Sequence, residues 1–267
     1  MGDRNVCGGT YGFVGELAWL FLWLMKILVI GEKCTDRFTY VDKNNVTTRE
    51  IIDQGMGGNV CNVLKTLGVI PDFIYNSENF EKQRIIDEIT FKTLDRKDSL
   101  QSLSECKSLP NVKKYDAVII SDNGFGYLNE NHIETLCKQN KNVFLETTKV
   151  LSHFCRNAKI IKINKDEFDL IENKIDLYEW KDKLIITTAE KGFIYSQKIH
   201  QPSKIYNFEI CAAGDAFLAY LTYYYLKTND LTESLFYANH SSRDIINKNG
   251  TLAKFKRGDK IVKKLNC

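Results

Sequence analysis

Five short, mainly aliphatic runs, four of which lead into a glycine or a polar residue, constrain the fold of this 267-residue chain more than any other feature. The runs occupy residues 27–30, 116–121, 142–145, 159–163 and 184–188. Runs of this length are typical of central strands in a parallel sheet that is buried on both faces. Because helix-like stretches alternate with them, the sequence predicts one α/β domain. Such sheets bind ligands at the carboxyl ends of their strands.

The composition argues against several other classes of protein. With 43% hydrophobic and 27% charged residues, the chain is typical of a globular domain and shows no sign of disorder. A net charge of +3 is too small to indicate nucleic-acid binding, so we expect no nucleic-acid partner. Eight cysteines and four histidines show no metal-binding spacing, which indicates reduced thiols in a cytoplasmic protein.

The first 24 residues are the least typical part of the sequence. Residues 13–30 are largely apolar, but Glu16 and Lys26 interrupt them, so we expect no stable membrane association. The alternative is a membrane-attached protein that uses residues 13–25. We interpret residues 1–24 as an extension and expect a single domain from residue 25 to residue 267.

Two pairs of alternating stretches predict antiparallel strands outside the main sheet. Residues 38–52 contain a turn-rich tetrapeptide at their centre, which predicts a β-hairpin that protrudes as a flap. Residues 82–94 predict a second pair of strands, which brings Lys82 and Arg84 near Arg96. These three cations either form surface salt bridges or face an anionic substrate.

Three further motifs sit at predicted helix starts. Residues 55–68 are a glycine-rich entry into a helix, suited either to packing or to close ligand approach. Asn164 either caps a helix or, with Glu167, positions metal-bound water. Residues 209–217 lead into an apolar helix whose first turn presents bare amides, a setting that binds phosphate. Asp215 is then either an ordinary first-turn acid or a base for phosphoryl transfer.

Taken in order, six motifs resemble those of the ribokinase, or pfkB, family of carbohydrate kinases, most closely the heptose 7-phosphate kinases of bacterial surface-sugar synthesis. They occupy residues 31–38, 55–59, 122–126, 164–167, 187–192 and 212–215. The resemblance implies a ribokinase-like three-layer sandwich with a mostly parallel central sheet. It also implies a small β-hairpin lid at about residues 38–52, through which many members of the family form homodimers.

The resemblance assigns a role to each candidate residue. Asp215 matches the catalytic base, and the anion hole matches Ala212, Ala213 and Gly214. The positions that hold the sugar match Asp36, Gly57, Gly58 and Asn59, and the basic residues that face a sugar phosphate match Lys82, Arg84 and Arg96. The nucleotide-binding positions match Thr187, Thr188, Gly192 and Asn239. Mg²⁺, through water, and phosphate would be organised by Asn164 and Glu167.

The resemblance therefore implies a kinase that uses ATP and Mg²⁺ to phosphorylate a sugar hydroxyl. The expected acceptor is the anomeric hydroxyl of a sugar phosphate similar to heptose 7-phosphate. The chain departs from the family at Ala189 and Ala212, where glycine is usual, and between Gly68 and Lys82, where members usually have a strand, a helix and a further strand. The alternative is a catalytically impaired protein of the same fold that binds sugar or nucleotide without turnover.

Overall fold

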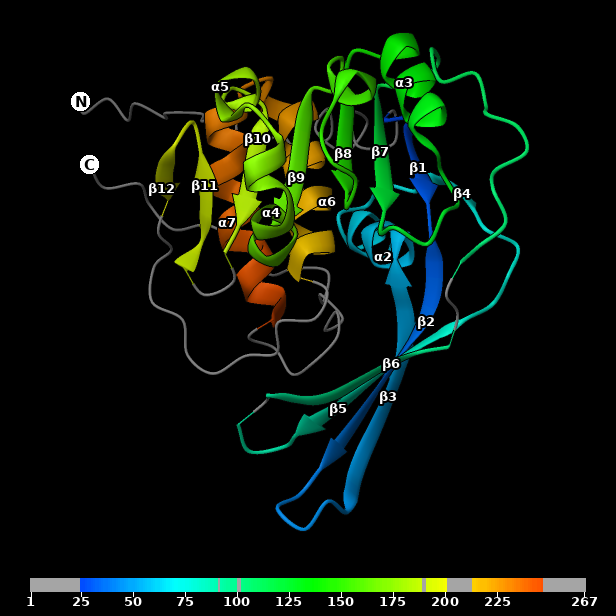
Figure 1. The fold of residues 1–267 in the computed structure, drawn as a ribbon, viewed down its shortest axis with the longest axis vertical. Helices are drawn as coiled ribbons and strands as arrows, with labels where there is room; N and C mark the ends of the chain where they lie inside the picture. Colours follow the sequence, from blue (N-terminus) through cyan, green and yellow to red (C-terminus); the bar gives the residue numbers. More distant parts are fainter. Residues whose placement is uncertain (1–24, 91, 100–101, 189–190, 201–212, 247–267) are drawn as a thin grey trace, which may run out of the picture.

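The main sheet of the computed structural model contains eight strands in the order β12-β11-β10-β9-β8-β7-β1-β4 (Figure 1). The structure describes residues 25–90, 92–99, 102–188, 191–200 and 213–246. The strands are β1 (Ile27–Gly31), β4 (Asp72–Tyr75), β7 (Ala117–Asp122), β8 (Val143–Thr147), β9 (Ile160–Asn164), β10 (Leu184–Thr187), β11 (Phe193–Tyr195) and β12 (Lys198–His200). The pairs from β4 to β10 are all parallel, whereas β11 and β12 add an antiparallel edge.

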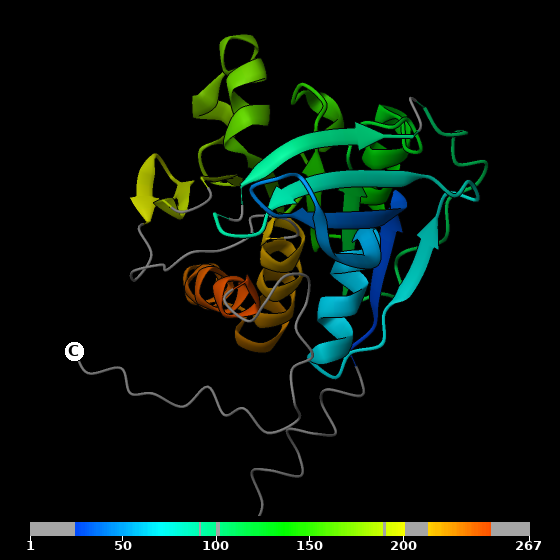
Figure 2. The same ribbon diagram turned by 90° about the horizontal axis from the view of Figure 1, so that it is seen from below.

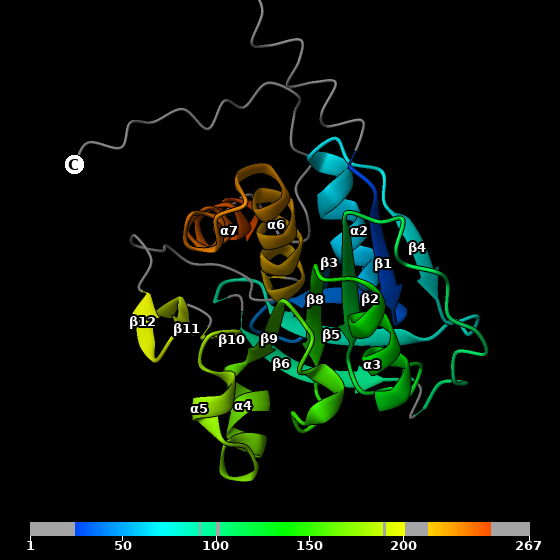
Figure 3. The same cartoon turned by 90° about the horizontal axis from the view of Figure 1, so that it is seen from above.

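Helices cover both faces of this sheet, which confirms the predicted three-layer sandwich (Figure 3). One face carries α2 (Gly57–Thr66), α6 (Ala213–Thr228) and α7 (Leu231–Ile246), and the other carries α3 (Glu130–Gln139), α4 (Lys165–Ile171) and α5 (Leu177–Trp180). The described residues also contain two short 3₁₀ helices, His153–Cys155 and Glu172–Lys174. Alternate residues of each central strand enter opposite cores. Leu28 and Ile30 pack in one, and Ile27 and Val29 in the other.

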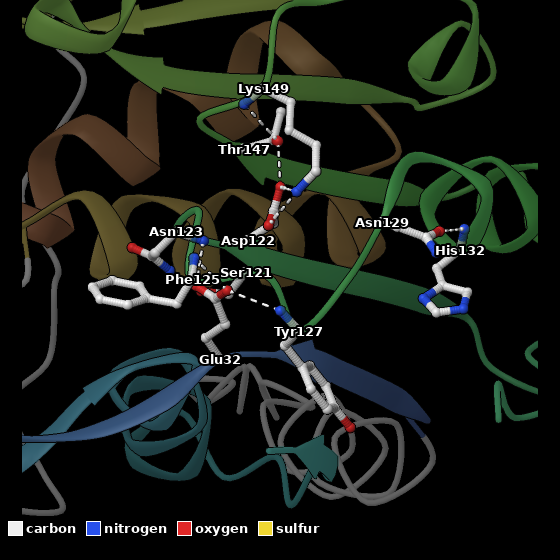
Figure 4. Close-up of polar contacts among 10 residues, drawn as sticks. All are labelled: Glu32, Ser121, Asp122, Asn123, Phe125, Tyr127, Asn129, His132, Thr147 and Lys149. Carbon is white, nitrogen blue, oxygen red and sulfur yellow. Dashed lines mark hydrogen bonds and ion pairs between the residues drawn. The ribbon is translucent and has the colours of Figure 1, made fainter. Parts of the chain in front are cut away.

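Local chemistry sets several helix boundaries. The side chain of Asn129 accepts the His132 N–H at 2.8 Å and caps α3 (Figure 4). After α2, Gly68 adopts a φ of 85°, a left-handed conformation that ends a helix most easily at glycine. The next strand, β4, begins only at Asp72.

A second sheet, called the lid below because it contains the predicted hairpin, projects from this body (Figure 1). It contains β2 (Lys33–Val41), β3 (Thr47–Met56), β5 (Glu81–Asp87) and β6 (Thr93–Asp98), in the order β3-β2-β5-β6. The predicted hairpin is thus longer than residues 38–52 and forms half of a four-stranded sheet. Seen from below, the lid strands cross the end of the main sheet (Figure 2).

The second predicted pair of strands is confirmed, but its second strand extends past residue 94 to Asp98. Residues 89 and 90 belong to the turn and not to a strand, because the Asp87 carboxylate accepts the N–H groups of Ile89 at 3.1 Å and Thr90 at 2.6 Å. Strand β6 therefore begins at Thr93. No helix within the described ranges is long and apolar enough to cross a membrane. The extension at residues 1–24 lies outside those ranges.

Candidate active site

The structure brings three of the predicted site residues together where the lid meets the body. Asp215 lies in the first turn of α6, and Asn59 on α2 donates an Nδ2–H hydrogen bond to its Oδ2 at 2.9 Å. Asn59 also lies near Asp36 on β2, where it favours the ionised form of that carboxyl and so lowers its pKa. One amide side chain therefore acts on two carboxylates, one from strand β2 and one from helix α6. The expected juxtaposition of Asp36, Asn59 and Asp215 is present.

Burial controls the electrostatics of these two carboxylates. The pKa of Asp215 is raised to about 8, first by burial and then by the negative charge of Glu146, against the opposing charge of Lys162. Burial also raises the pKa of Asp36, and the cations Lys82 and Arg84 oppose that rise. Both carboxyls thus hold protons more tightly than ordinary aspartates do.

The three predicted basic residues share one face of the lid sheet. In the register, Asp36 lies beside Lys82, and Arg84 lies opposite Arg96. Arg84 is 13% exposed and pairs with Asp98 at 3.1 Å, whereas Arg96 is exposed. Since residues two apart on a strand point to the same side, this face carries positive charge next to Asp36.

The two glycines that begin α2 are accounted for by close packing. A Cβ at Gly57 would lie 2.9 Å from the Phe73 ring, and one at Gly58 would lie 2.7 Å from the Cβ of Gln54. Close packing is therefore enough to explain why both positions are glycine.

Two buried carboxylates to which the sequence analysis assigned no role, Glu32 and Asp122, lie at the 122–126 motif. The carboxylate of Glu32 accepts the N–H groups of Asn123 and Phe125, each at 2.8 Å (Figure 4). Asp122 pairs with the Lys149 ammonium at 2.7 Å. Burial and the Asp122 charge raise the pKa of Glu32. Glu32 follows the first aliphatic run and Gly31, and a carboxylate at the carboxyl end of a central strand could have been predicted as a site residue.

Asn164 and Glu167 form a capping box at the start of α4. The Glu167 N–H donates to Asn164 Oδ1, and Glu167 Oε2 accepts the Asn164 N–H, both at 2.8 Å. The capping interpretation is therefore correct. The other carboxylate oxygen of Glu167 takes no hydrogen bond from the described residues, and burial raises the pKa of this carboxyl.

A buried ion pair was also missed by the sequence interpretation. Glu146 at the end of β8 pairs with Lys162 in the middle of β9, and the two residues are 6% and 2% exposed. The available signal was a lysine inside an aliphatic run, IIKIN. The pair lies beneath α6, since a Cβ added to Gly214 would sit 2.5 Å from the Lys162 Nζ.

The predicted nucleotide-binding residues fall in two places. Thr188 and Gly192 close the connection between β10 and β11, where the Thr188 N–H donates to the Gly192 carbonyl at 2.8 Å. The buried Thr188 Oγ1 has no hydrogen-bond partner in the described part of the chain. Thr187 ends β10, and Asn239 is buried on α7. Ala213 and Gly214 begin α6, while Ala189 and Ala212 lie outside the described residues.

Comparison with known proteins places these features in a family. The model of the pfkB family carbohydrate kinases matches residues 87–256, more than half of the chain. The bifunctional protein HldE of a Nitratiruptor species is 28% identical over 200 residues, which cover 66% of this chain and 43% of that protein. The chain therefore spans less than half the length of this curated relative.

Solved structures of other kinases share the fold at low sequence identity. A ribokinase from Thermotoga maritima has a TM-score of 0.65 at 12% identity and covers 87% of this chain and 96% of its own. A nucleoside kinase from Methanocaldococcus jannaschii, described as an archaeal member of the ribokinase family, has a TM-score of 0.62 at 15% identity, with 87% and 95% covered. Arabidopsis thaliana ribokinase, solved with ribose and ATP, has a TM-score of 0.62 at 12% identity, with 85% and 94% covered.

The matched segment contains six of the eight strands of the main sheet, from β7 to β12, together with α6 and Asp215, and the neighbours share the ribokinase-like fold. The chain therefore belongs to the pfkB family of carbohydrate kinases, phosphotransferases that use an alcohol group as acceptor.

Proposed function

We propose that this chain transfers the terminal phosphoryl group of ATP to a sugar hydroxyl, with Asp215 as the general base. The observation that carries the proposal is the hydrogen bond from Asn59 to Asp215 beside Asp36. It places polar groups suited to sugar hydroxyls next to a carboxylate in the first turn of a helix. A base within hydrogen-bond reach of the acceptor typically contributes about 10² to 10⁴ in rate.

Each part of the site then has a defined task. Asp215 takes the proton of the acceptor hydroxyl, and Asp36 and Asn59 orient the sugar. The first-turn amides of α6, from Ala213 and Gly214, face the transferred phosphoryl group and supply electrostatic stabilisation. The nucleotide lies along the β10–β11 connection, where the Thr188 hydroxyl has no partner among the described residues and is available to it. Thr187, Gly192 and Asn239 surround the remainder.

The residues present fit Mg²⁺ held through water. In proteins this ion usually keeps several waters and binds substrate phosphates with one or two carboxylates nearby. The second oxygen of Glu167 is not used by the capping box, so it fits a hydrogen bond to a metal-bound water, with Asn164 beside it. When bound, Mg²⁺ offsets the negative charge of the phosphates.

For the sugar, we propose a phosphorylated substrate similar to heptose 7-phosphate, with the anomeric hydroxyl as acceptor. Support comes from the basic face that Lys82, Arg84 and Arg96 form next to Asp36. The similarity to the HldE protein supports the same class of substrate. A sugar that already carries a phosphate would bind this face through charge-assisted hydrogen bonds.

A substrate panel tests the proposal. The protein is assayed for ATP consumption with Mg²⁺ and one of heptose 7-phosphate, fructose 6-phosphate, ribose or adenosine. We expect turnover with a sugar phosphate and little with the unphosphorylated compounds. Folded protein that turns over none of them would contradict the proposal. Calorimetric binding of sugar or nucleotide in that case would support the impaired protein that binds without turnover.

A further inference from the structure

A buried cation lies next to the proposed base. Lys162 is 2% exposed in the middle of β9, and its ammonium is paired with Glu146 Oε1 from β8. Apolar residues of similar size often replace a buried ion pair without loss of stability. Stability alone therefore gives little reason for this pair, and its surroundings point to a role in the site.

The ammonium of Lys162 lies against the backbone of the first turn of α6. A Cβ built on Gly214 would lie 2.5 Å from the Nζ of Lys162, 3.3 Å from its Cε and 3.7 Å from Glu146 Oε1. Gly214 immediately precedes Asp215. Any larger side chain at this position would displace the ion pair, so the glycine and the pair form one packed unit.

Several elements contribute charges around the Asp215 carboxylate. Negative charge comes from Glu146 on β8 and Asp36 on β2, and the positive charge of Lys162 on β9 opposes it. On α2, Asn59 donates a hydrogen bond to Asp215, and Glu167 on α4 acts on Lys162. The Cys34 thiol on β2 stays neutral because burial and Asp36 raise its pKa. Lys162 therefore opposes the negative charge that Glu146 and Asp36 add around Asp215.

We propose that Lys162 is a positioning residue for phosphoryl transfer, whose ammonium, anchored by Glu146, supports the first turn of α6 and opposes the negative charge around Asp215. The proposal rests on the proposed function of Asp215 as base. A base must be a carboxylate before it can accept a proton. In this site Lys162 favours that form and Glu146 disfavours it.

The test uses two variants that act in opposite directions. Lys162→Met removes the favourable charge, so the apparent pKa of Asp215 should rise, by about one unit. Glu146→Gln removes a repulsive charge, so the same pKa should fall. The measurement is carbon-13 NMR of carboxyl-labelled aspartates across pH in the full chain, with the Asp215 signal identified by its absence in Asp215→Asn. A residue that only maintains the fold would not shift this titration in opposite directions.

The second readout is the acidic limb of the pH profile of kcat/KM, measured with the best substrate of the panel. In each variant this limb should shift in the same direction as the pKa of Asp215, upward for Lys162→Met and downward for Glu146→Gln. Lys149→Met is the matched control, since it breaks the ion pair between Lys149 and the buried Asp122. This variant should change neither the apparent pKa of Asp215 nor the acidic limb of kcat/KM. If Lys162→Met does not fold, because Glu146 is left without a partner, the double variant Lys162→Met with Glu146→Met takes its place. The apparent pKa of Asp215 in this double variant should then be higher than in Glu146→Gln, which keeps the Lys162 charge.

The proposal would be overturned if the apparent pKa of Asp215 did not change in Lys162→Met and Glu146→Gln, or if it changed in the same direction in both. The proposed function fails separately. An Asp215→Asn variant with near wild-type turnover would exclude Asp215 as base while leaving the NMR result valid. Complete loss of turnover in that variant, with unchanged titrations in the other two, would reject only the role of Lys162.

Discussion

The Asp215 carboxyl combines a position suited to catalysis with surroundings that disfavour its charge. It is half-buried, and Glu146 and Asp36 add negative charge, so its pKa lies well above the ordinary range of aspartate. Active sites often hold groups in such unfavourable states at a cost in stability. The site residue proposed to be most important for the reaction should therefore also destabilise the fold when it is ionised.

Replacing Asp215 by asparagine should stabilise the protein without substrates, by about 1 kcal/mol. Because the folded pKa is raised, the stability linked to this carboxyl is fully present below the unfolded pKa. That stability is lost as the pH rises through the folded pKa. The advantage of Asp215→Asn should therefore be larger at about pH 9 than at about pH 6. Urea unfolding of both proteins at the two pH values measures it, and a variant that is less stable at both would contradict the argument.

Gly31 should tolerate no side chain. It has a φ of 153°, and a Cβ there would collide with the carbonyl oxygen of Ser121 on the neighbouring strand β7. We expect Gly31→Ala to cost more than about 3 kcal/mol, because backbone atoms of two central strands would have to separate. The matched control is Gly68→Ala, which has open space around it and should cost only about 1 kcal/mol. Equal losses in thermal unfolding would contradict this explanation.

At the level of single residues, the order of motifs was sufficient to predict that Asp36, Asn59 and Asp215 meet. Glu146 and Lys162 were not predicted, because a charge in a strand reveals its partner only when the register and the covering helix are known. Lys162 faces the first turn of α6, some fifty residues later in the chain, and no local pattern encodes that contact. Contacts among residues of the six motifs were thus predictable, whereas contacts made by residues outside them were not.

The same division holds for helices and strands. The start of α4 and the end of α2 were predicted because a capping box and a glycine decide them locally. The lid was predicted only as a hairpin, since the parallel pairing of β2 with β5 joins strands that a helix and β4 separate in the sequence. Such pairing depends on the position of the whole body of the protein.

The basic face of the lid should determine the affinity for a phosphorylated sugar. We expect Arg84→Ala to raise the KM of the sugar phosphate about tenfold or more, since a charge-assisted hydrogen bond is worth about 1.5–3 kcal/mol. The KM of ATP should change little. Arg37→Ala is the control, because Arg37 lies on the other face of the lid and pairs with Glu50 at 2.7 Å. Equal effects of the two variants in steady-state kinetics would argue against a phosphate site on this face.

For the whole molecule, we propose a homodimer through the lid. The lid exposes apolar side chains, among them Ile52, which is 56% exposed on β3. Exposed apolar groups on a projecting sheet favour association. We expect a dimer by analytical ultracentrifugation, and Ile52→Glu should shift it towards monomer. Ile70→Glu alters a residue of the body that is 79% exposed and should leave the dimer intact. A wild-type monomer at all concentrations would refute the proposal.

The central claim is that Asp215 is the base of a sugar kinase, and the kcat of Asp215→Asn tests it most directly. With ATP, Mg²⁺ and the best substrate of the panel, we predict a loss of kcat of about 10² to 10⁴, with the dissociation constant of ATP nearly unchanged. Glu134→Gln removes a partly exposed carboxylate from α3 and should keep wild-type kcat. An Asp215→Asn variant whose kcat remains within about tenfold of the wild type would contradict the account.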